Sequence, residues 1–393
     1  MKTISFQRRC IALFTILTAP VMAPHAVAEV AIPDPSLASA IRYELVIWPT
    51  DPITESTLAA MTYLSAKGYD IVDLTGLEYC TSLEYLRLEE NQISDLTPLA
   101  GLTGLKWLLL GSNPISDLTP LAGLTSLKWL QLGFSPISDL TPLAGLTNLT
   151  SLDLGGNQIS DLTPLAGLTS LTNLSLWNNQ ISDLTPLAGL TSLTSLGIAQ
   201  NLLTDLTPLQ GLTKLTALYL YSNRISDLTP LAGLTSLTDL ELMRNQITDL
   251  TPLSGLTSLT DLDLRLNCIS DLFPLLGLNA LVDLFLEYNP LSDTTIAEHI
   301  PQLSDNFAYV TYYPRSDEYC PASEGEGEGE THPADMNTDW RMVMSEAVAY
   351  LAGWQQGSNP MNYAIRAAYL WQNGEQYAYD AGQVPSMCWI LAP

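Results

Sequence analysis

Basic residues and histidines are scarce in this sequence of 393 residues. Lys and Arg together number 15 against 41 Asp and Glu, which gives a net charge of −26 at pH 7. Such a surface repels phosphate backbones and anionic lipids, so nucleic acid is excluded as a partner and any membrane association is peripheral. With only 3 histidines and no phosphate-binding loop, hydrolase or zinc-protease motif, an enzyme is a remote alternative.

Long apolar runs are absent except near the first residue. Lys2, Arg8 and Arg9 precede an apolar run over 11–21, and a small-residue site, Ala26-Val27-Ala28, follows. This is the pattern of a cleaved secretory signal peptide, and the run is too short to span a membrane permanently. We therefore expect residues 1–28 to be removed and the rest to be secreted or held at the cell surface.

A repeat of 22 residues dominates what is present. Its unit reads L-x-x-L-x-L-x-x-N-x-I-S-D-L-T-P-L-A-G-L-T-x, and ten copies run over 83–293 without insertion or deletion. A fixed period of this length is typical of a solenoid in which each turn packs only on its neighbours. Alternation such as Leu86-Arg87-Leu88 indicates one strand per turn, with leucines inward and the intervening residues outward.

The unit resembles the leucine-rich repeats of bacterial proteins, and its S-D-L-T-P-L-A-G-L-T segment is similar to that of internalins. The resemblance implies an α/β solenoid: a horseshoe or arc with a parallel sheet on its concave side and short 3₁₀ turns on its convex side. It also implies that the protein binds another macromolecule. A long, shallow surface without a deep cleft favours binding over catalysis.

Polar residues at fixed positions predict how each turn is closed. Asn recurs from Asn91 to Asn289 at the bend after each strand, where a stacked amide can satisfy unpaired backbone groups. Ser135 interrupts this row, which predicts that the third turn is the weakest. Asp95 and its equivalents are expected to cap turns, and Pro98 and its counterparts are expected to prevent a long convex helix.

The segments outside the repeats predict caps, a linker and a second domain. Residues 29–82 are expected to form a helical N-terminal cap, with helices near 36–45 and 55–65, because a solenoid must cover the core of its first turn. Residues 294–322 are expected to form the C-terminal cap, with a helix at 294–300 and a strand at 307–312. The alternating Gly and Glu of 323–330 predict an extended linker, followed by a small helical module over 331–393.

That C-terminal module contains an EF-hand-like spacing. Asp335, Asn337, Asp339 and Glu346 occupy positions 1, 3, 5 and 12 of a 12-residue loop, and the backbone carbonyl of Arg341 would complete a set of oxygen ligands suited to calcium. With its following helix, the loop resembles half of a dockerin module, which implies calcium-dependent folding and docking to a cohesin-like receptor. Two departures are Trp340, where such loops have Gly, and the absence of a second loop. The alternative is a two-helix module whose acidic loop caps a helix.

The four cysteines that follow the signal peptide are Cys80, Cys268, Cys320 and Cys388. Cys80 and Cys268 are about eight turns apart, roughly 40 Å at about 4.8 Å per strand, which is too far for a disulfide. We expect Cys80 to have no partner within the chain, whereas a Cys320–Cys388 bridge could close the C-terminal module.

Outward-facing positions of the repeats supply the candidate binding residues. Aromatic rings there are not needed for the core, and exposed aromatic rows mark interaction surfaces; carboxylates on the later repeats adjoin them. The candidates are Tyr85, Trp107, Trp129, Trp177, Tyr219, Tyr221, Asp239, Glu241, Asp261, Asp263, Asp283 and Glu287. This combination favours a protein ligand with a basic, partly apolar surface. The alternative is a carbohydrate-binding component that is attached through the dockerin-like tail.

Overall fold

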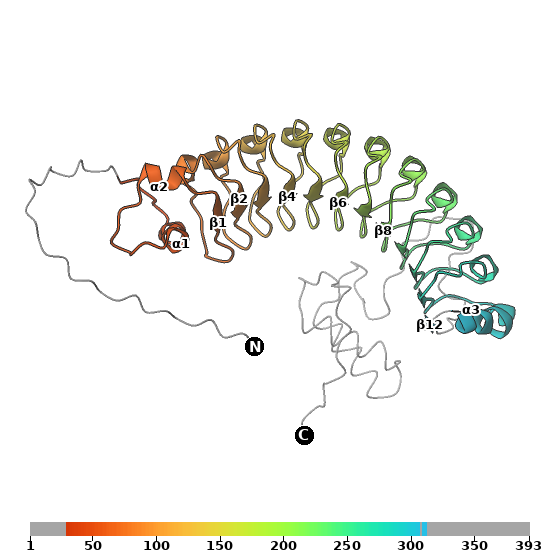
Figure 1. Cartoon of the computed structure of the whole chain (residues 1–393). Coiled ribbons are helices and arrows are strands. Elements are labelled where there is room, and N and C mark those ends of the chain that lie inside the picture. Colours follow the sequence, from red (N-terminus) through yellow and green to blue (C-terminus); the bar gives the residue numbers. More distant parts are fainter. Residues whose placement is uncertain (1–28, 307–308, 313–393) are drawn as a thin grey trace, which may run out of the picture. The chain divides into compact units, whose positions relative to one another are not determined.

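The computed structural model describes residues 29–306 and 309–312. Within these residues, twelve short strands form one parallel sheet in which β1 to β12 follow one another in chain order. The strands line the inner side of an arc and the short helical turns lie on its outer side (Figure 1). The predicted leucine-rich repeat solenoid, with its parallel concave sheet and short 3₁₀ convex turns, is confirmed.

Each strand is three residues long and pairs with its neighbour 22 residues away throughout the repeats, as in Leu86 with Leu108. The middle residue of each repeat strand points into the core and the two flanking residues point outward. The strands are β1 (Tyr63–Ser65), β2 (Tyr85–Arg87), β3 (Trp107–Leu109), β4 (Trp129–Gln131), β5 (Ser151–Asp153), β6 (Asn173–Ser175), β7 (Ser195–Gly197), β8 (Ala217–Tyr219), β9 (Asp239–Glu241), β10 (Asp261–Asp263), β11 (Asp283–Phe285) and β12 (Tyr309–Thr311).

Short 3₁₀ helices lie on the convex side. Each repeat helix consists of Thr-Pro-Leu or Phe-Pro-Leu. The Asp two residues before it accepts a hydrogen bond from its first N–H, as where the Thr97 N–H donates to Asp95 Oδ1 over 2.8 Å. The predicted capping role of these aspartates is therefore confirmed. The helices are η1 (Leu77–Tyr79), η2 (Thr97–Leu99), η3 (Thr119–Leu121), η4 (Thr141–Leu143), η5 (Thr163–Leu165), η6 (Thr185–Leu187), η7 (Thr207–Leu209), η8 (Thr229–Leu231), η9 (Thr251–Leu253) and η10 (Phe273–Leu275).

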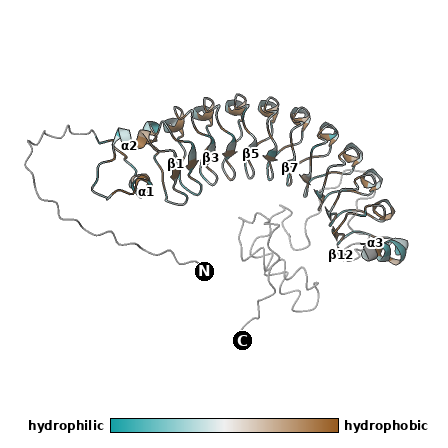
Figure 2. Ribbon diagram, in the orientation of Figure 1, coloured by the Kyte–Doolittle hydropathy of each residue, from teal (hydrophilic) through white to brown (hydrophobic). Residues whose placement is uncertain are grey.

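The core is a continuous column of leucine and isoleucine between the sheet and the convex turns. Leu86, Leu88, Ile93 and Leu99 are almost completely buried, and so are their equivalents in the other turns. Apolar residues recur on the strand and on the convex turn of every repeat (Figure 2). Because each turn buries its leucines only against adjacent turns, the stability of the arc is a sum of turn and neighbour terms.

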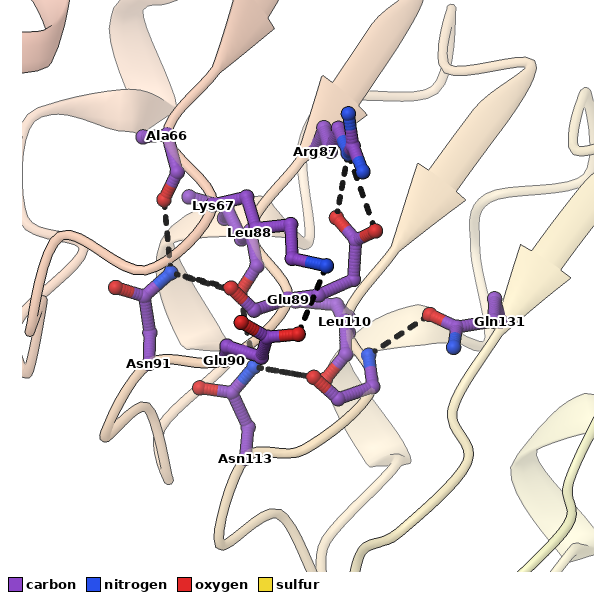
Figure 3. Close-up of polar contacts among 11 residues, drawn as sticks. Ala66, Lys67, Arg87, Leu88, Glu89, Glu90, Asn91, Leu110, Asn113 and Gln131 are labelled. Atoms are coloured by element: carbon purple, nitrogen blue, oxygen red, sulfur yellow. Dashed lines mark hydrogen bonds and ion pairs between the residues drawn. The ribbon is translucent and has the colours of Figure 1, made fainter. Parts of the chain in front are cut away.

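An asparagine ladder connects the turns beside this core. The Asn113 Nδ2 donates to Leu110 O at 2.8 Å in its own turn and to Leu88 O at 2.9 Å in the preceding turn, while Oδ1 accepts the Ile93 N–H at 3.0 Å. Figure 3 shows two rungs of this ladder, made by Asn91 and Asn113. The predicted role of the amide row is confirmed, since each side chain satisfies backbone groups of two turns.

Ser135 leaves a gap in the ladder. Its side chain is buried, and its Oγ has no hydrogen-bond partner within the described residues. The Ile115 N–H, which elsewhere would reach an Asn Oδ1, donates instead to the Asn113 backbone carbonyl at 2.8 Å. The third turn therefore lacks three hydrogen bonds that a regular rung makes, which agrees with its predicted weakness.

The N-terminal cap consists of α1 (Pro35–Leu45) and α2 (Glu55–Ala59). Asp34 caps α1 by accepting the Ser36 and Leu37 N–H groups, and its second oxygen accepts N–H groups of Val72 and Asp73 in the first turn. Burial alone would raise the pKa of Asp34, but these four backbone bonds hold it below its ordinary value. One carboxylate thus joins the cap to the solenoid.

The expected helix over 55–65 was too long, because α2 ends at Ala59 and Tyr63–Ser65 is already the first strand of the sheet. Met61, Leu64 and Ala66 occupy the leucine positions of an additional turn and are buried. The substitution of Met and Ala for Leu made this turn look aperiodic. It begins the solenoid one repeat earlier than the sequence indicated.

The C-terminal cap contains the π-helical turn η11 (Thr295–His299), α3 (Ile300–Asn306) and the last strand, β12. The helix predicted over 294–300 is present and continues to Asn306, and the strand predicted over 307–312 contains β12. None of the described helices is long and apolar enough to cross a bilayer.

The two cysteines within the described residues differ in state. Cys80 is a free thiol buried in the core, as predicted, and burial followed by the nearby Glu78 raises the pKa of this thiol to about 12. Cys268 is disulfide-bonded, which the sequence did not predict. Cys320 and Cys388 lie outside the described residues, so a bridge between them stays a prediction.

Candidate binding face

Four aromatic side chains, three exposed and one half-buried, occupy equivalent positions on the first four strands. Tyr63, Tyr85, Trp107 and Trp129 pair with one another in register across β1 to β4, and we call them the aromatic row. Tyr63, Trp107 and Trp129 are 43%, 37% and 47% exposed. Because inward-facing leucines already fill the core, these rings are not required for packing. They form an apolar surface on the concave side.

The first three rings of the aromatic row contact one another. Tyr63 and Tyr85 stack with centroids 4.8 Å apart and planes 15° from parallel. Trp107 follows at 6.4 Å from Tyr85 with a tilt of 39°. Such contacts fix the rings before a ligand arrives, so little side-chain entropy remains to be lost on binding.

A second aromatic pair lies where the chain leaves the strands. Phe134 and Trp177 meet edge to face with centroids 5.1 Å apart, although they belong to turns separated by one repeat. The intermediate turn has Gly155 and Gly156 there: a Cβ on Gly155 would lie 2.1 Å from Trp177 Nε1, and one on Gly156 would lie 3.0 Å from Phe134 Cδ1. The two glycines therefore make room for the aromatic pair.

Carboxylates replace aromatics at the same register position on the later strands. Asp239, Asp261 and Asp283 pair in register across β9 to β11, and we call them the acidic row. The hydroxyls of Thr238 and Thr260 donate to Asp239 and Asp261, the latter over 2.7 Å. The row is therefore oriented by its own strands.

Crowding and burial perturb the pKa values of this region. Burial, followed by the charge of Asp261, raises the pKa of Asp283. Glu241 occupies the second outward position of β9. Burial together with the neighbouring Asp263 raises its pKa to about 7, although Arg265 opposes the change. Burial and three nearby carboxylates also raise the pKa of Tyr219. Burial is the largest cause of each raised pKa, and neighbouring carboxylates add to it; a cationic ligand group would oppose these shifts.

Arg265 is the basic residue within this acidic region, and it is already held by neighbours. Its Nε donates to both oxygens of Asp263, at 2.9 and 3.0 Å, and its guanidinium lies 5.2 Å from the ring centroid of Phe285. Phe285 contacts Tyr309 edge to face at 6.0 Å. The bidentate pair neutralises Asp263 and leaves the acidic row to dominate the local charge.

The predicted site residues fall into three groups according to their position along their strands. Tyr85, Trp107, Trp129, Asp239, Asp261 and Asp283 occupy the first outward position of their strands, and Tyr219, Glu241 and Asp263 occupy the second. Trp177, Tyr221 and Glu287 lie just beyond strand ends, on the rim of the face.

Four aromatic residues described above were missed from the sequence: Tyr63, Phe134, Phe285 and Tyr309. Tyr63 lies one period before Tyr85, and its strand was assigned to the helical cap. Phe134 and Tyr309 occupy a bend and the C-terminal cap strand, where strand alternation does not apply or was not extended. A search at the 22-residue offset would have found Tyr63.

The predicted calcium ligands, Asp335, Asn337, Asp339, Arg341 and Glu346, lie outside the described residues. Within the described part of the chain, no group of three or more His, Cys, Asp or Glu side chains could hold a metal ion. Calcium binding by the tail therefore stays a prediction.

Comparison with known proteins agrees with this architecture. Family models described as leucine-rich repeats match residues 125–167, 169–211, 213–255, 79–96 and 255–272. An internalin (inlF) from Listeria monocytogenes is 35% identical over 73% of this chain and 96% of its own, with a TM-score of 0.52. The chain belongs to the leucine-rich repeat family. No curated protein sequence matches this leucine-rich repeat protein significantly.

Two further structures share the leucine-rich repeat fold. Internalin C2 (inlC2) from Listeria monocytogenes is 42% identical and covers 55% of this chain and 94% of its own, with a TM-score of 0.51. The leucine-rich repeat protein LIC12759 from Leptospira interrogans is 27% identical over 61% of this chain and 62% of its own, with a TM-score of 0.55. The similarity to these structures concerns the arc and does not identify a ligand.

Proposed function

We propose that this leucine-rich repeat protein is an extracellular binding protein that recognises a protein ligand with the concave face of its arc. The observation that supports this proposal most directly is the aromatic row. Four large rings lie in register on consecutive strands, and three of them remain exposed although the core does not need them. Preorganised aromatic clusters of this kind contribute most of the energy in many protein interfaces.

The charge of the face supports the same proposal. The acidic row continues the register position of the aromatic row along the arc, so one face offers an apolar region and a negatively charged region. Complementary charge increases the association rate and selects between partners. Export by the predicted signal peptide and attachment by the C-terminal module complete the proposal.

Binding can be tested by replacing matched aromatic residues on opposite sides of the arc. The exported chain, residues 29–393, is used to capture partners from its native surroundings, and dissociation constants are then measured for each partner recovered. We expect Trp107→Ala with Trp129→Ala to weaken binding at least tenfold. Phe273→Ala is the control, because Phe273 is 65% exposed on the convex helix η10.

The comparison of the two variants decides whether the concave face is the binding surface. Equal affinities for the parent protein and the Trp107/Trp129 double variant, with both chains folded by circular dichroism, would contradict the proposal. Loss of binding in Phe273→Ala alone would place the ligand on the convex side instead. An internal check is salt dependence, since a charge-steered protein association slows as ionic strength rises.

A further inference from the structure

The first three rings of the aromatic row leave no room for a ligand ring between them. The Tyr63 and Tyr85 rings stack on each other at 4.8 Å, and Trp107 follows at 6.4 Å from Tyr85. A sugar ring stacked between two aromatic rings needs about 3.5–4.0 Å on each side, which these spacings do not leave. A sugar ring therefore cannot insert between these rings, whereas apolar side chains can pack against the exposed parts of Tyr63, Trp107 and Trp129.

Small side chains separate the aromatic row from the acidic row. Ser151, Asn173, Ser195 and Ala217 occupy the same register position on β5 to β8, so the middle of the face has no large side chain at this position. A ligand backbone can therefore stay close to the sheet between the two regions. The three segments lie along one line across the strands.

Within the described residues, no Lys or Arg side chain forms an ion pair with the acidic row. Thr238 and Thr260 hold Asp239 and Asp261 in place, but hydroxyl groups carry no charge. Arg265 is held by Asp263 and Phe285, in the neighbouring column. Lys or Arg side chains of a ligand would form charge-assisted hydrogen bonds with these carboxylates.

The spacing of the strands determines how far apart the two contact regions of a ligand must lie. The aromatic row ends on β4 and the acidic row begins on β9, five strands later, which is roughly 24 Å at about 4.8 Å per strand. An extended polypeptide covers about 3.3 Å per residue, so this gap corresponds to about seven residues. The whole line from β1 to β11 corresponds to about 15 residues.

We propose that the ligand contributes one extended polypeptide segment to this line, with an apolar part on the aromatic row and a Lys- or Arg-rich part on the acidic row, separated by about seven residues. This inference rests on the proposed function, because it specifies the ligand of the same concave face. It adds the chemical class of the ligand, its two contact regions and the distance between them.

The test uses two defined probes, a phage-displayed library of random 16-residue peptides and an array of immobilised glycans, each presented to the labelled exported chain. We expect enriched peptides to share an apolar cluster and a Lys/Arg cluster at the stated spacing. Their synthetic forms should lose at least tenfold in affinity with Trp107→Ala/Trp129→Ala and with Asp261→Asn/Asp283→Asn. Shortening the spacer by three residues should cause a similar loss.

A matched charge control separates specific contacts from general attraction to an acidic protein. Glu44→Gln/Glu298→Gln removes the same charge from the two caps, and it should leave the affinity of the selected peptides within twofold. If this control weakens binding as much as Asp261→Asn/Asp283→Asn does, the acidic row has no special role and the inference is wrong.

The remaining outcomes distinguish the inference from the function on which it rests. Glycan binding that the Trp107/Trp129 variant abolishes would overturn the polypeptide assignment and retain the concave face as the binding surface. Peptides whose binding depends on the aromatic row alone would overturn the two-region ligand. Enriched peptides that neither concave variant affects would contradict the proposed function itself, and failure to enrich any peptide would count against the inference.

Discussion

Replacing Ser135 by Asn should strengthen the arc at its weakest rung. In every other repeat, Asn donates to two backbone carbonyls and accepts one N–H, whereas Ser135 does none of these and leaves its Oγ unpaired. The new amide would reach Leu110 O, Leu132 O and the Ile115 N–H. The backbone already suits it, because Phe134 has φ 58°, equal to that of Ser112, which precedes Asn113.

The expected gain follows from what each group does now. Leu110 O already accepts from Asn113 and Leu132 O from Asn157, and the Ile115 N–H has an alternative acceptor in Asn113 O. No backbone group is therefore orphaned, and the three new bonds contribute less than their full value. With about 0.5–1.5 kcal/mol for each net hydrogen bond, less the entropy of fixing the Asn side chain, we expect Ser135→Asn to stabilise the fold by about 1–2 kcal/mol.

Urea unfolding followed by circular dichroism measures the overall change, and hydrogen exchange of peptides covering 105–140 shows whether protection rises at this turn. Asn157→Ser is the matched control, since it removes the Asn157 amide that donates to Leu132 O and Leu154 O and should cost about 2–3 kcal/mol. Unchanged exchange and an unchanged or lower midpoint for Ser135→Asn would refute the ladder argument. In that case, the packing of the adjacent turns would already compensate for the missing amide at Ser135.

Three further predictions concern titration, thiol chemistry and the tail. The pKa of Glu241 is raised to about 7 in the folded state. Its contribution to the free energy of unfolding is therefore full below its unfolded pKa and is lost as pH rises through about 7. Between pH 5 and pH 8, the urea midpoint of Glu241→Gln should fall less than that of the parent protein. Cys80, buried with a pKa of about 12, should react with a thiol reagent only after denaturant is added, and fast reaction in native buffer would show that the first turn opens. For the exported chain, we expect a thermal transition of the C-terminal module to rise in calcium relative to chelator and the difference to vanish in Asp335→Ala or Glu346→Ala; identical curves would remove the EF-hand hypothesis.

The repeat made the solenoid predictable in detail, and its boundaries were harder. Leucine at a fixed 22-residue period, alternation within each strand and the Thr-Pro-Leu turn each indicate the same local structure, so their agreement determined the strands, the convex helices and the asparagine ladder. The first turn was missed because Met61 and Ala66 replace leucine. The core accepts Met and Ala at these positions because both are apolar and fit the space, but a search for leucine alone does not detect them.

The sequence predicted which residues of the candidate site face outward, but it did not predict which side chains contact one another. Alternation correctly indicated that Trp107, Trp129 and Asp261 face outward, because that follows from the strand period alone. Stacking of Tyr63 on Tyr85 and pairing of Arg265 with Asp263 depend on side-chain conformations that no period determines. The raised pKa of Glu241 has the same origin, since it reflects burial and neighbours in adjacent turns.

Departures from the repeat unit carry the functional information of this chain, because the unit itself is nearly invariant from turn to turn. Convex positions keep Asp, Thr and Pro in almost every repeat, and each has a local hydrogen-bonding or conformational role. The first outward position of the strands is not fixed by the repeat unit and changes from Tyr and Trp on β1 to β4, through Ser, Asn and Ala, to Asp on β9 to β11. Packing and backbone satisfaction do not require this ordered gradient. The proposed ligand, which would span the arc, would account for both its direction and its place on the concave face.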